Sequence, residues 1–244
     1  IKVTLYDGQE VSAKLVNYDA SNDLAVLQMD ENVKVPGVVT LGDSSNLKVG
    51  ESVIAIGNPL SKEFAGTVTS GIISATQRAV TIGSNEYNYI QTDAAINPGN
   101  SGCALIDVAG NVIGVNTAIF SQSGGSMGIG FAIPAKICQQ VLNSILKDGR
   151  VVRGWLGISL LPSKQDDILV PEQNGVVVAD VLRDGPAAQA GLKRGDIIMS
   201  VNGEAISTPA QLINYVALQA PSSTVSVVVK RGDDNLTLSV VIGE

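Results

Sequence analysis

Turn-forming residues divide the chain into short stretches in which apolar and polar side chains alternate. Residues 1–6 alternate in this way, Asp7 and Gly8 supply a hairpin turn, and residues 11–16 alternate again. Several short strands at this spacing are typical of β-sandwiches and β-barrels, not of a βαβ sheet. The region 1–133 is therefore expected to be mainly β. Its other predicted strands include residues 24–29, 52–56, 66–76 and 111–120.

One helix is predicted directly after this region. Pro134 stands where a first-turn proline is tolerated, and the apolar residues between Ile137 and Leu146 recur with helical period. Gly149 is placed to end the helix. The expected helix therefore closes a first domain of residues 1–150.

A different pattern begins at about residue 154, where short strands alternate with helical candidates at 186–191 and 209–218. This pattern predicts a mixed α/β module, and about ninety residues is a reasonable size for a domain. We therefore expect a second domain over residues 154–244. Its predicted strands are residues 155–160, 175–181, 197–201, 225–230 and 236–241.

Charge and composition exclude several classes of function. The net charge of −7 argues against a phosphate-binding surface, so no nucleic-acid partner is expected. The chain contains no run of about 18 apolar residues, as a membrane-spanning helix would need. It begins at Ile1 and shows no signal peptide, so we expect a trimmed piece whose targeting signal or membrane anchor lies outside it.

The residues that usually bind metals are scarce. The chain has no histidine, which argues against a zinc site of the usual histidine and cysteine kind, and no cofactor is expected. Its two cysteines, Cys103 and Cys138, do not make a disulfide framework. We expect two unpaired thiols, because free cysteine often behaves as a small buried apolar residue.

The segment richest in chemistry is residues 93–105, which contain Pro98-Gly99-Asn100-Ser101-Gly102. A serine is a weak nucleophile unless a base takes its proton and fixed donors hold the resulting oxyanion. Glycines on both sides of Ser101 let the backbone turn sharply, so that nearby N–H groups can point at one spot. On composition alone, such a segment is more often a polar turn.

This segment resembles the nucleophile loop of the HtrA family of trypsin-like proteases. The resemblance implies that Ser101 is the nucleophile and that the N–H groups of Gly99, Asn100 and Ser101 form the oxyanion hole. Residues 21–27, Ser-Asn-Asp-Leu-Ala-Val-Leu, resemble the family's catalytic aspartate segment, which implies that Asp23 orients a histidine.

Further matches to the family are residues 55–59, 67–75 and 128–134. The resemblance implies a primary specificity pocket formed around Ile96, Ile119 and Phe120, which would favour small or medium apolar side chains. Arg78 aligns with an arginine that, in this family, senses the ligand of the PDZ domain.

The segment Gly154-Trp155-Leu156-Gly157-Ile158 resembles the carboxylate-binding loop of PDZ domains, and residues 185–198 and 201–203 follow the HtrA-type PDZ pattern. The resemblance implies that Trp155, Leu156, Gly157 and Ile158 bind the C-terminus of a peptide that adds as a strand to the sheet edge.

The implied fold is mainly β: a chymotrypsin-like double β-barrel with the first barrel incomplete, followed by a mixed α/β PDZ domain.

The family's catalytic histidine lies upstream of the residues matched here. Either the N-terminal piece of the first barrel is absent from this sequence, which we favour, or the protein is a true pseudoprotease. A lysine base is a third alternative.

Cys103 stands where the family has glycine, and it would be strained if that position needs a positive φ.

The resemblance implies a serine endopeptidase of the bacterial envelope that acts in protein quality control or stress signalling. Its expected substrates are unfolded or regulatory proteins, and peptide C-termini at the PDZ domain are expected to gate it. The family further implies a homotrimer in the periplasm, with an inner-membrane anchor outside this chain as one option. A single PDZ domain fits the DegS-like branch, and a two-PDZ relative of the DegP or DegQ type stays open. The alternative function is a catalytically inactive peptide-binding sensor or scaffold.

Overall fold

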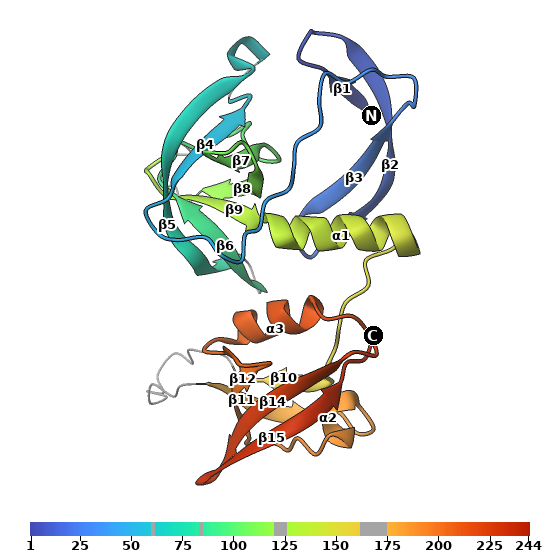
Figure 1. Ribbon diagram of the computed structural model, residues 1–244, viewed down its shortest axis with the longest axis vertical. Coiled ribbons are helices and arrows are strands. Elements are labelled where there is room, and N and C mark those ends of the chain that lie inside the picture. The colour runs from blue at the N-terminus through green and yellow to red at the C-terminus, as the bar shows by residue number, and fades with distance from the viewer. Residues whose placement is uncertain (60–61, 83–84, 120–125, 162–174) are drawn as a thin grey trace. The chain divides into compact units, whose positions relative to one another are not determined.

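The computed structural model describes residues 1–59, 62–82, 85–119, 126–161 and 175–244 (Figure 1). The chain divides into two compact units, Ile1–Val151 and Val152–Glu244. Both are built mainly from antiparallel strands, which confirms the predicted mainly β fold.

The first unit begins with a three-stranded antiparallel sheet in the order β1-β2-β3. Gly8, at φ 85°, lies in the turn that joins the first two strands, as the Asp-Gly signal predicts. An open sheet of three strands here agrees with the incomplete first barrel expected from the sequence. The strands are β1 (Lys2–Thr4), β2 (Glu10–Asp19) and β3 (Leu24–Met29).

A closed six-stranded barrel follows, in the order β4-β5-β6-β9-β8-β7 (Figure 1). Its centre is apolar: Ile73, Ile90 and Leu105 are wholly buried and pack against Val53 and Ile113. The strands are β4 (Ser52–Gly57), β5 (Thr67–Ile82), β6 (Asn85–Thr92), β7 (Ala104–Asp107), β8 (Val112–Ile119) and β9 (Gly130–Pro134), with a 3-10 turn η1 (Lys62–Phe64) before β5.

Helix α1 (Ala135–Asp148) closes this unit, where the sequence predicts it. Pro134 is its N-cap residue, and Gly149 ends it in the left-handed conformation at φ 68°, donating its N–H to Ile145 O. The helix contacts β8 and β9 of the barrel and β2 and β3 of the small sheet. It therefore fixes the position of the small sheet against the barrel.

The second unit has one sheet in the order β10-β11-β12-β14-β15, with β13 paired to β12. Its core is rich in valine, and Leu212 and Val216 of helix α3 (Pro209–Ala217) pack into it. Thr208 and Gln211 form a capping box at the start of that helix. The elements are β10 (Ile158–Leu160), β11 (Val176–Val181), α2 (Pro186–Gln189), β12 (Ile197–Val201), β13 (Glu204–Ala205), α3 (Pro209–Ala217), β14 (Thr224–Arg231) and β15 (Asp234–Val241).

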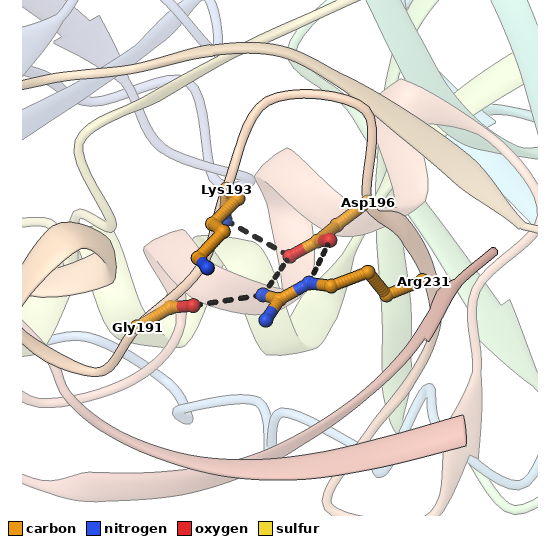
Figure 2. Close-up of polar contacts among 4 residues, drawn as sticks. All are labelled: Gly191, Lys193, Asp196 and Arg231. Carbon is orange, nitrogen blue, oxygen red and sulfur yellow. Dashed lines mark hydrogen bonds and ion pairs between the residues drawn. The ribbon is translucent and has the colours of Figure 1, made fainter. Parts of the chain in front are cut away.

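An ion pair with a buried carboxylate connects the turn before β12 to the end of β14 (Figure 2). The Asp196 side chain is 1% exposed and accepts from Arg231 Nε and Nη2, each at 2.7 Å. It also accepts from the N–H of Lys193 at 2.9 Å, and Arg231 Nη2 donates to Gly191 O at 2.8 Å. Arg231 therefore holds the whole turn that leads from α2 into β12, and it lowers the pKa of Asp196 below the ordinary value.

Candidate active site and peptide-binding loop

Ser101 lies in a tight loop between β6 and β7. Gly99 and Gly102, on either side of it, have φ values of 101° and 85°, a region that glycine adopts without strain. Asn100 N donates to Asn97 O at 2.9 Å, and Cys103 N donates to Asn100 O at 3.0 Å. These successive turns leave the Ser101 side chain exposed at the surface of the loop.

Side chains fasten the start of this loop to β5. Thr92 Oγ1 donates to Ile72 O at 2.8 Å, and Asp93 Oδ1 accepts from Ile72 N at 2.7 Å. Glycine is required at the neighbouring position, because a Cβ on Gly71 would collide with Ala94 N and Asp93 Oδ1. The sequence analysis did not single out Asp93 and Gly71 as a pair, since nothing in the pattern indicates that they meet.

Thr117, in β8, connects the two predicted catalytic residues. Ser101 Oγ donates to Thr117 O at 2.9 Å, and Thr117 Oγ1 donates to Asp23 Oδ2 at 3.4 Å. Asp23 lies in the turn between β2 and β3 with a positive φ of 55°. Asp23 and Ser101, 78 positions apart, are thus gathered around a single threonine. Sequence reasoning missed Thr117, because a threonine inside a strand is an ordinary strand residue.

The three predicted oxyanion donors are not equivalent. Asn100 N–H is already used within the turn, whereas those of Gly99 and Ser101 donate to no acceptor in the described part of the chain. The Asn100 side chain points inward and is 2% exposed, and its Oδ1 has no partner among the described residues. Two N–H groups, on alternate residues, are thus available to an incoming anion.

A buried tyrosine lies behind Asp23. Tyr89 is 5% exposed and stacks on Tyr87, with ring centroids 5.5 Å apart. Burial is the main cause that raises the pKa of Tyr89 to about 12, and the charges of Tyr87 and Asp23 add to it. The phenol is therefore neutral at any physiological pH. Tyr89 thus adds no negative charge near Asp23.

The predicted specificity residues are only partly described. Ile96 is 1% exposed, and a Cβ on Gly130 would lie 2.7 Å from Ile96 Cγ1, so these two positions are closely packed. Ile119 ends β8, and Phe120 lies outside the described residues. Arg78 is exposed on β5, and its Nε donates to Gln91 Oε1 at 2.8 Å on the neighbouring strand.

Both cysteines are free thiols. Cys103 has no positive φ, so a cysteine in place of the family's glycine causes no backbone strain. Its Sγ lies 3.8 Å from Gly99 O, and a Cβ on Gly57 would come within 3.0 Å of it. Cys103 therefore fills space beneath the nucleophile loop. Burial raises the pKa of Cys138 to about 11, which keeps that thiol protonated.

The predicted peptide-binding loop turns its carbonyl groups inward. Trp155 O accepts from Gly243 N at 2.9 Å, Leu156 O accepts from Ala187 N at 2.9 Å, and Gly157 O accepts from Leu182 N at 2.8 Å. Within the described residues, the N–H groups of Leu156 and Gly157 have no acceptor. A loop with satisfied carbonyls and unused N–H groups can bind an anion.

Among the described residues, no strand pairs with the outer edge of the sheet beside this loop. The strand β10, which follows the loop directly, is the first strand in the sheet order. It pairs with β11 on one side, through Ile158 and Val181. A peptide whose terminal carboxylate reaches the loop can therefore add along β10 as a strand.

The described residues contain no group of three or more potential metal ligands and no helix long and apolar enough to cross a membrane.

Comparisons with known proteins give the class of each unit. Residues 1–115 match the family model described as a trypsin-like peptidase domain, and residues 154–242 match that of a PDZ domain. A peptidase of the trypsin class joined to a PDZ domain is therefore the kind of protein that this chain represents.

Individual relatives are more specific. The chain is 43% identical over 245 residues to the "Probable periplasmic serine endoprotease DegP-like" of Rhizobium meliloti, covering 99% of this chain and 48% of the relative. It is 48% identical over 229 residues to the protein of the same name from Bartonella henselae, covering 92% and 44%. The chain thus spans about half the length of these curated relatives.

The solved structures that this chain resembles are of the same class of protein. The HtrA-type protease AlgW with a tripeptide has a TM-score of 0.76 at 47% identity, covering 99% of this chain and 80% of that one. AlgW with a decapeptide has a TM-score of 0.73 at 47% identity, covering 99% and 74%. The serine endoprotease from Yersinia pestis has a TM-score of 0.63 at 37% identity, covering 100% and 79%. The chain belongs to the HtrA family of serine proteases.

Proposed function

We propose that this chain carries out peptide-bond hydrolysis as part of a periplasmic serine endopeptidase. The observation that supports this most is the gathering of Ser101 and Asp23 around Thr117, beside two N–H groups that no described residue accepts from. The periplasm is proposed from the printed names of the relatives. Unfolded or regulatory proteins are the proposed substrates, and a homotrimer is the proposed assembly.

In the proposed mechanism, Ser101 Oγ attacks the substrate carbonyl while an imidazole accepts its proton. Asp23 orients that imidazole and stabilises its cationic form, and the N–H groups of Gly99 and Ser101 donate to the oxyanion. The imidazole then protonates the leaving amine. Because the 244 residues contain no histidine, this base has to come from outside the given sequence.

The second candidate function, a catalytically inactive peptide sensor, has one observation in its favour. Ser101 Oγ donates its hydrogen bond to the carbonyl of Thr117, and a hydroxyl in that arrangement is not activated. The two candidates differ in whether a base reaches the space next to Ser101 in the protein that the cell makes.

Intact mass and N-terminal sequencing of the native protein, with fluorophosphonate labelling, separate the two candidates. A longer chain that contains a histidine and is labelled at Ser101 supports the endopeptidase. A native chain that starts at Ile1 and is never labelled supports the sensor. The Ser101→Ala variant is the matched control, because it removes only the labelled oxygen.

We further propose that the loop Trp155–Ile158 binds the free C-terminus of a peptide and that this binding gates proteolysis. The inward carbonyls and the open edge of β10 support the binding. Gating is proposed to act through Arg78. An array of decapeptides that differ in the C-terminal residue, assayed first for binding and then for stimulation of cleavage, tests the two steps separately. Stimulation that survives in Arg78→Ala would contradict the role of Arg78.

A further inference from the structure

We infer that Trp155 is a positioning residue that, together with Gly243, holds the carboxylate-binding loop in the conformation that presents the N–H groups of Leu156 and Gly157, and that it does not itself receive the peptide. This inference rests on the proposed binding of peptide C-termini by the second unit. It separates Trp155 from the three loop residues that follow it.

The backbone of Trp155 is not available to a ligand. Trp155 N donates to Gly243 O and Gly243 N donates to Trp155 O, both at 2.9 Å, which makes an isolated antiparallel bridge. Both polar main-chain groups of Trp155 are therefore used inside the unit. The unused N–H groups begin at Leu156, one residue later.

The indole ring covers two glycines. A Cβ on Gly157 would lie 3.2 Å from Trp155 Cη2 and Cζ2, and a Cβ on Gly243 would lie 3.1 Å from Trp155 Cε3. A Cβ on Gly243 would also lie 2.8 Å from Pro186 Cγ, which places the first residue of α2 at the same contact. An aromatic side chain that packs over glycines supplies the contacts that those residues lack.

Gly157 is the residue that most needs this support. Its φ of 75° lies in the left-handed region, its N–H has no acceptor among the described residues, and its carbonyl accepts from Leu182 N. Glycine also has more conformational freedom than any other residue. Holding Gly157 in this one conformation is therefore costly in conformational entropy. The ring of Trp155 restricts Gly157 from one side, and the bridge to Gly243 restricts Trp155. Preorganisation of the N–H groups, which raises affinity for an anion, follows from both contacts.

The test uses the whole 244-residue chain and the tightest decapeptide from the array, made once with a free C-terminal carboxylate and once as the carboxamide. Calorimetry gives both dissociation constants. In wild type the carboxylate form binds more tightly. In Trp155→Ala that preference falls about tenfold, the order expected when one charge-assisted hydrogen bond is lost. In Gly243→Ala it falls less, because the ring is displaced and not removed.

Two matched variants keep this test specific. Trp155→Phe retains a flat ring over Gly157, and it is expected to keep the preference within about twofold. Val241→Ala removes an exposed apolar side chain from the nearby strand β15 and leaves the preference unchanged. Circular dichroism melts identify any variant that fails to fold.

Three results would overturn the inference. Both dissociation constants could stay unchanged in Trp155→Ala, or both could rise equally so that the preference for carboxylate persists, which would indicate contact with the peptide itself. A wild-type chain that binds carboxylate and carboxamide alike would remove the proposed C-terminal binding, and the inference with it. The first two outcomes leave the proposed function standing and the third does not, so the two failures are distinguishable.

Discussion

The two units supply their functional groups in opposite ways. In the first unit, Asp23, Ser101 and Thr117 come from three separate segments, and hydrogen bonds through Thr117 are what connect the other two. In the second unit, Leu156 and Gly157 present their N–H groups from one short stretch of backbone. One site depends on how distant segments are held, and the other on the conformation of a single loop.

This difference indicates how each site fails. A site assembled from distant segments is disturbed when any one of them moves, since each contributes a single group. A loop of consecutive residues is disturbed mainly through its own dihedral angles, as at Gly157, and through what packs on it. Changes in one unit should therefore leave the assembly of the other site intact, and the proposed gating by a bound peptide is the one functional link expected between the two units.

The largest expected effect is on catalysis. In the protein as the cell makes it, Ser101→Ala should lower kcat by about 10⁶-fold, because the nucleophilic oxygen is lost. Cleavage of an unfolded protein substrate measures this. Peptide binding to the second unit serves as the internal control and should not change. Residual cleavage near the wild-type rate would show that another residue is the nucleophile.

The second prediction concerns the stability of the second unit. Arg231→Met leaves the Asp196 carboxylate buried without its partner, so the melting temperature of this unit should fall by about 10 °C. Trp155 is the only tryptophan in the chain, so its fluorescence reports unfolding of the second unit alone. Fluorophosphonate labelling of the active protein, measured without added peptide, should not change, and a loss of labelling over the same temperature range would show that the two units do not unfold independently.

A smaller effect is expected at Thr117. Thr117→Val keeps the shape of the side chain and removes the hydroxyl that donates to Asp23. We expect kcat to fall about tenfold with little change in KM, the order of one hydrogen bond to a charged group. Thr117→Ser, which restores the hydroxyl, is the control and should recover most of the rate. A change in KM alone would instead place Thr117 in substrate binding.

The smallest expected effect is a pH dependence. Because Arg231 lowers the pKa of Asp196 below 3.8, the unfolded chain binds a proton there at acidic pH before the folded chain does. The contribution of this ion pair to the free energy of unfolding is therefore complete well above pH 3.8. It is lost as the pH falls through the lower pKa of Asp196 in the folded chain. Urea unfolding followed by Trp155 fluorescence should show this loss between about pH 5 and pH 2. Asp196→Asn should flatten the dependence, and an unchanged slope in that variant would assign it to other groups.

Much of the fold could be read from alternation and turn signals, but not all of it. The hairpin at Asp7-Gly8 and the helix that ends at Gly149 were predicted, and the structure confirms both. The sequence did not single out strands β6, β7 and β9. In β9 the residues are buried on both sides, so no alternation exists to be read. β7 has only four residues, and a run that short gives a weak periodic signal.

The predicted site residues show the same contrast between what the sequence indicates and what only the structure reveals. Family resemblance pointed to Ser101, Asp23 and the loop Trp155–Ile158, and those roles stay predictions. Resemblance grouped Trp155 with its neighbours as a peptide contact, and the pairing with Gly243 is visible only in the structure. Residue identity shows where glycine and serine occur, but not which N–H groups other parts of the chain have already used.

Four properties follow from the sequence alone: the mainly β character, the change of pattern near residue 154, the absence of histidine and the glycines that allow sharp turns. These are local properties, because strand periodicity and glycine conformations depend on neighbouring residues. The three-dimensional packing is needed to see that Thr117 lies between Ser101 and Asp23, that Arg231 pairs with Asp196, and that Trp155 covers Gly157. Such contacts join residues far apart in sequence or depend on where a side chain packs, and packing is fixed only when the whole core forms.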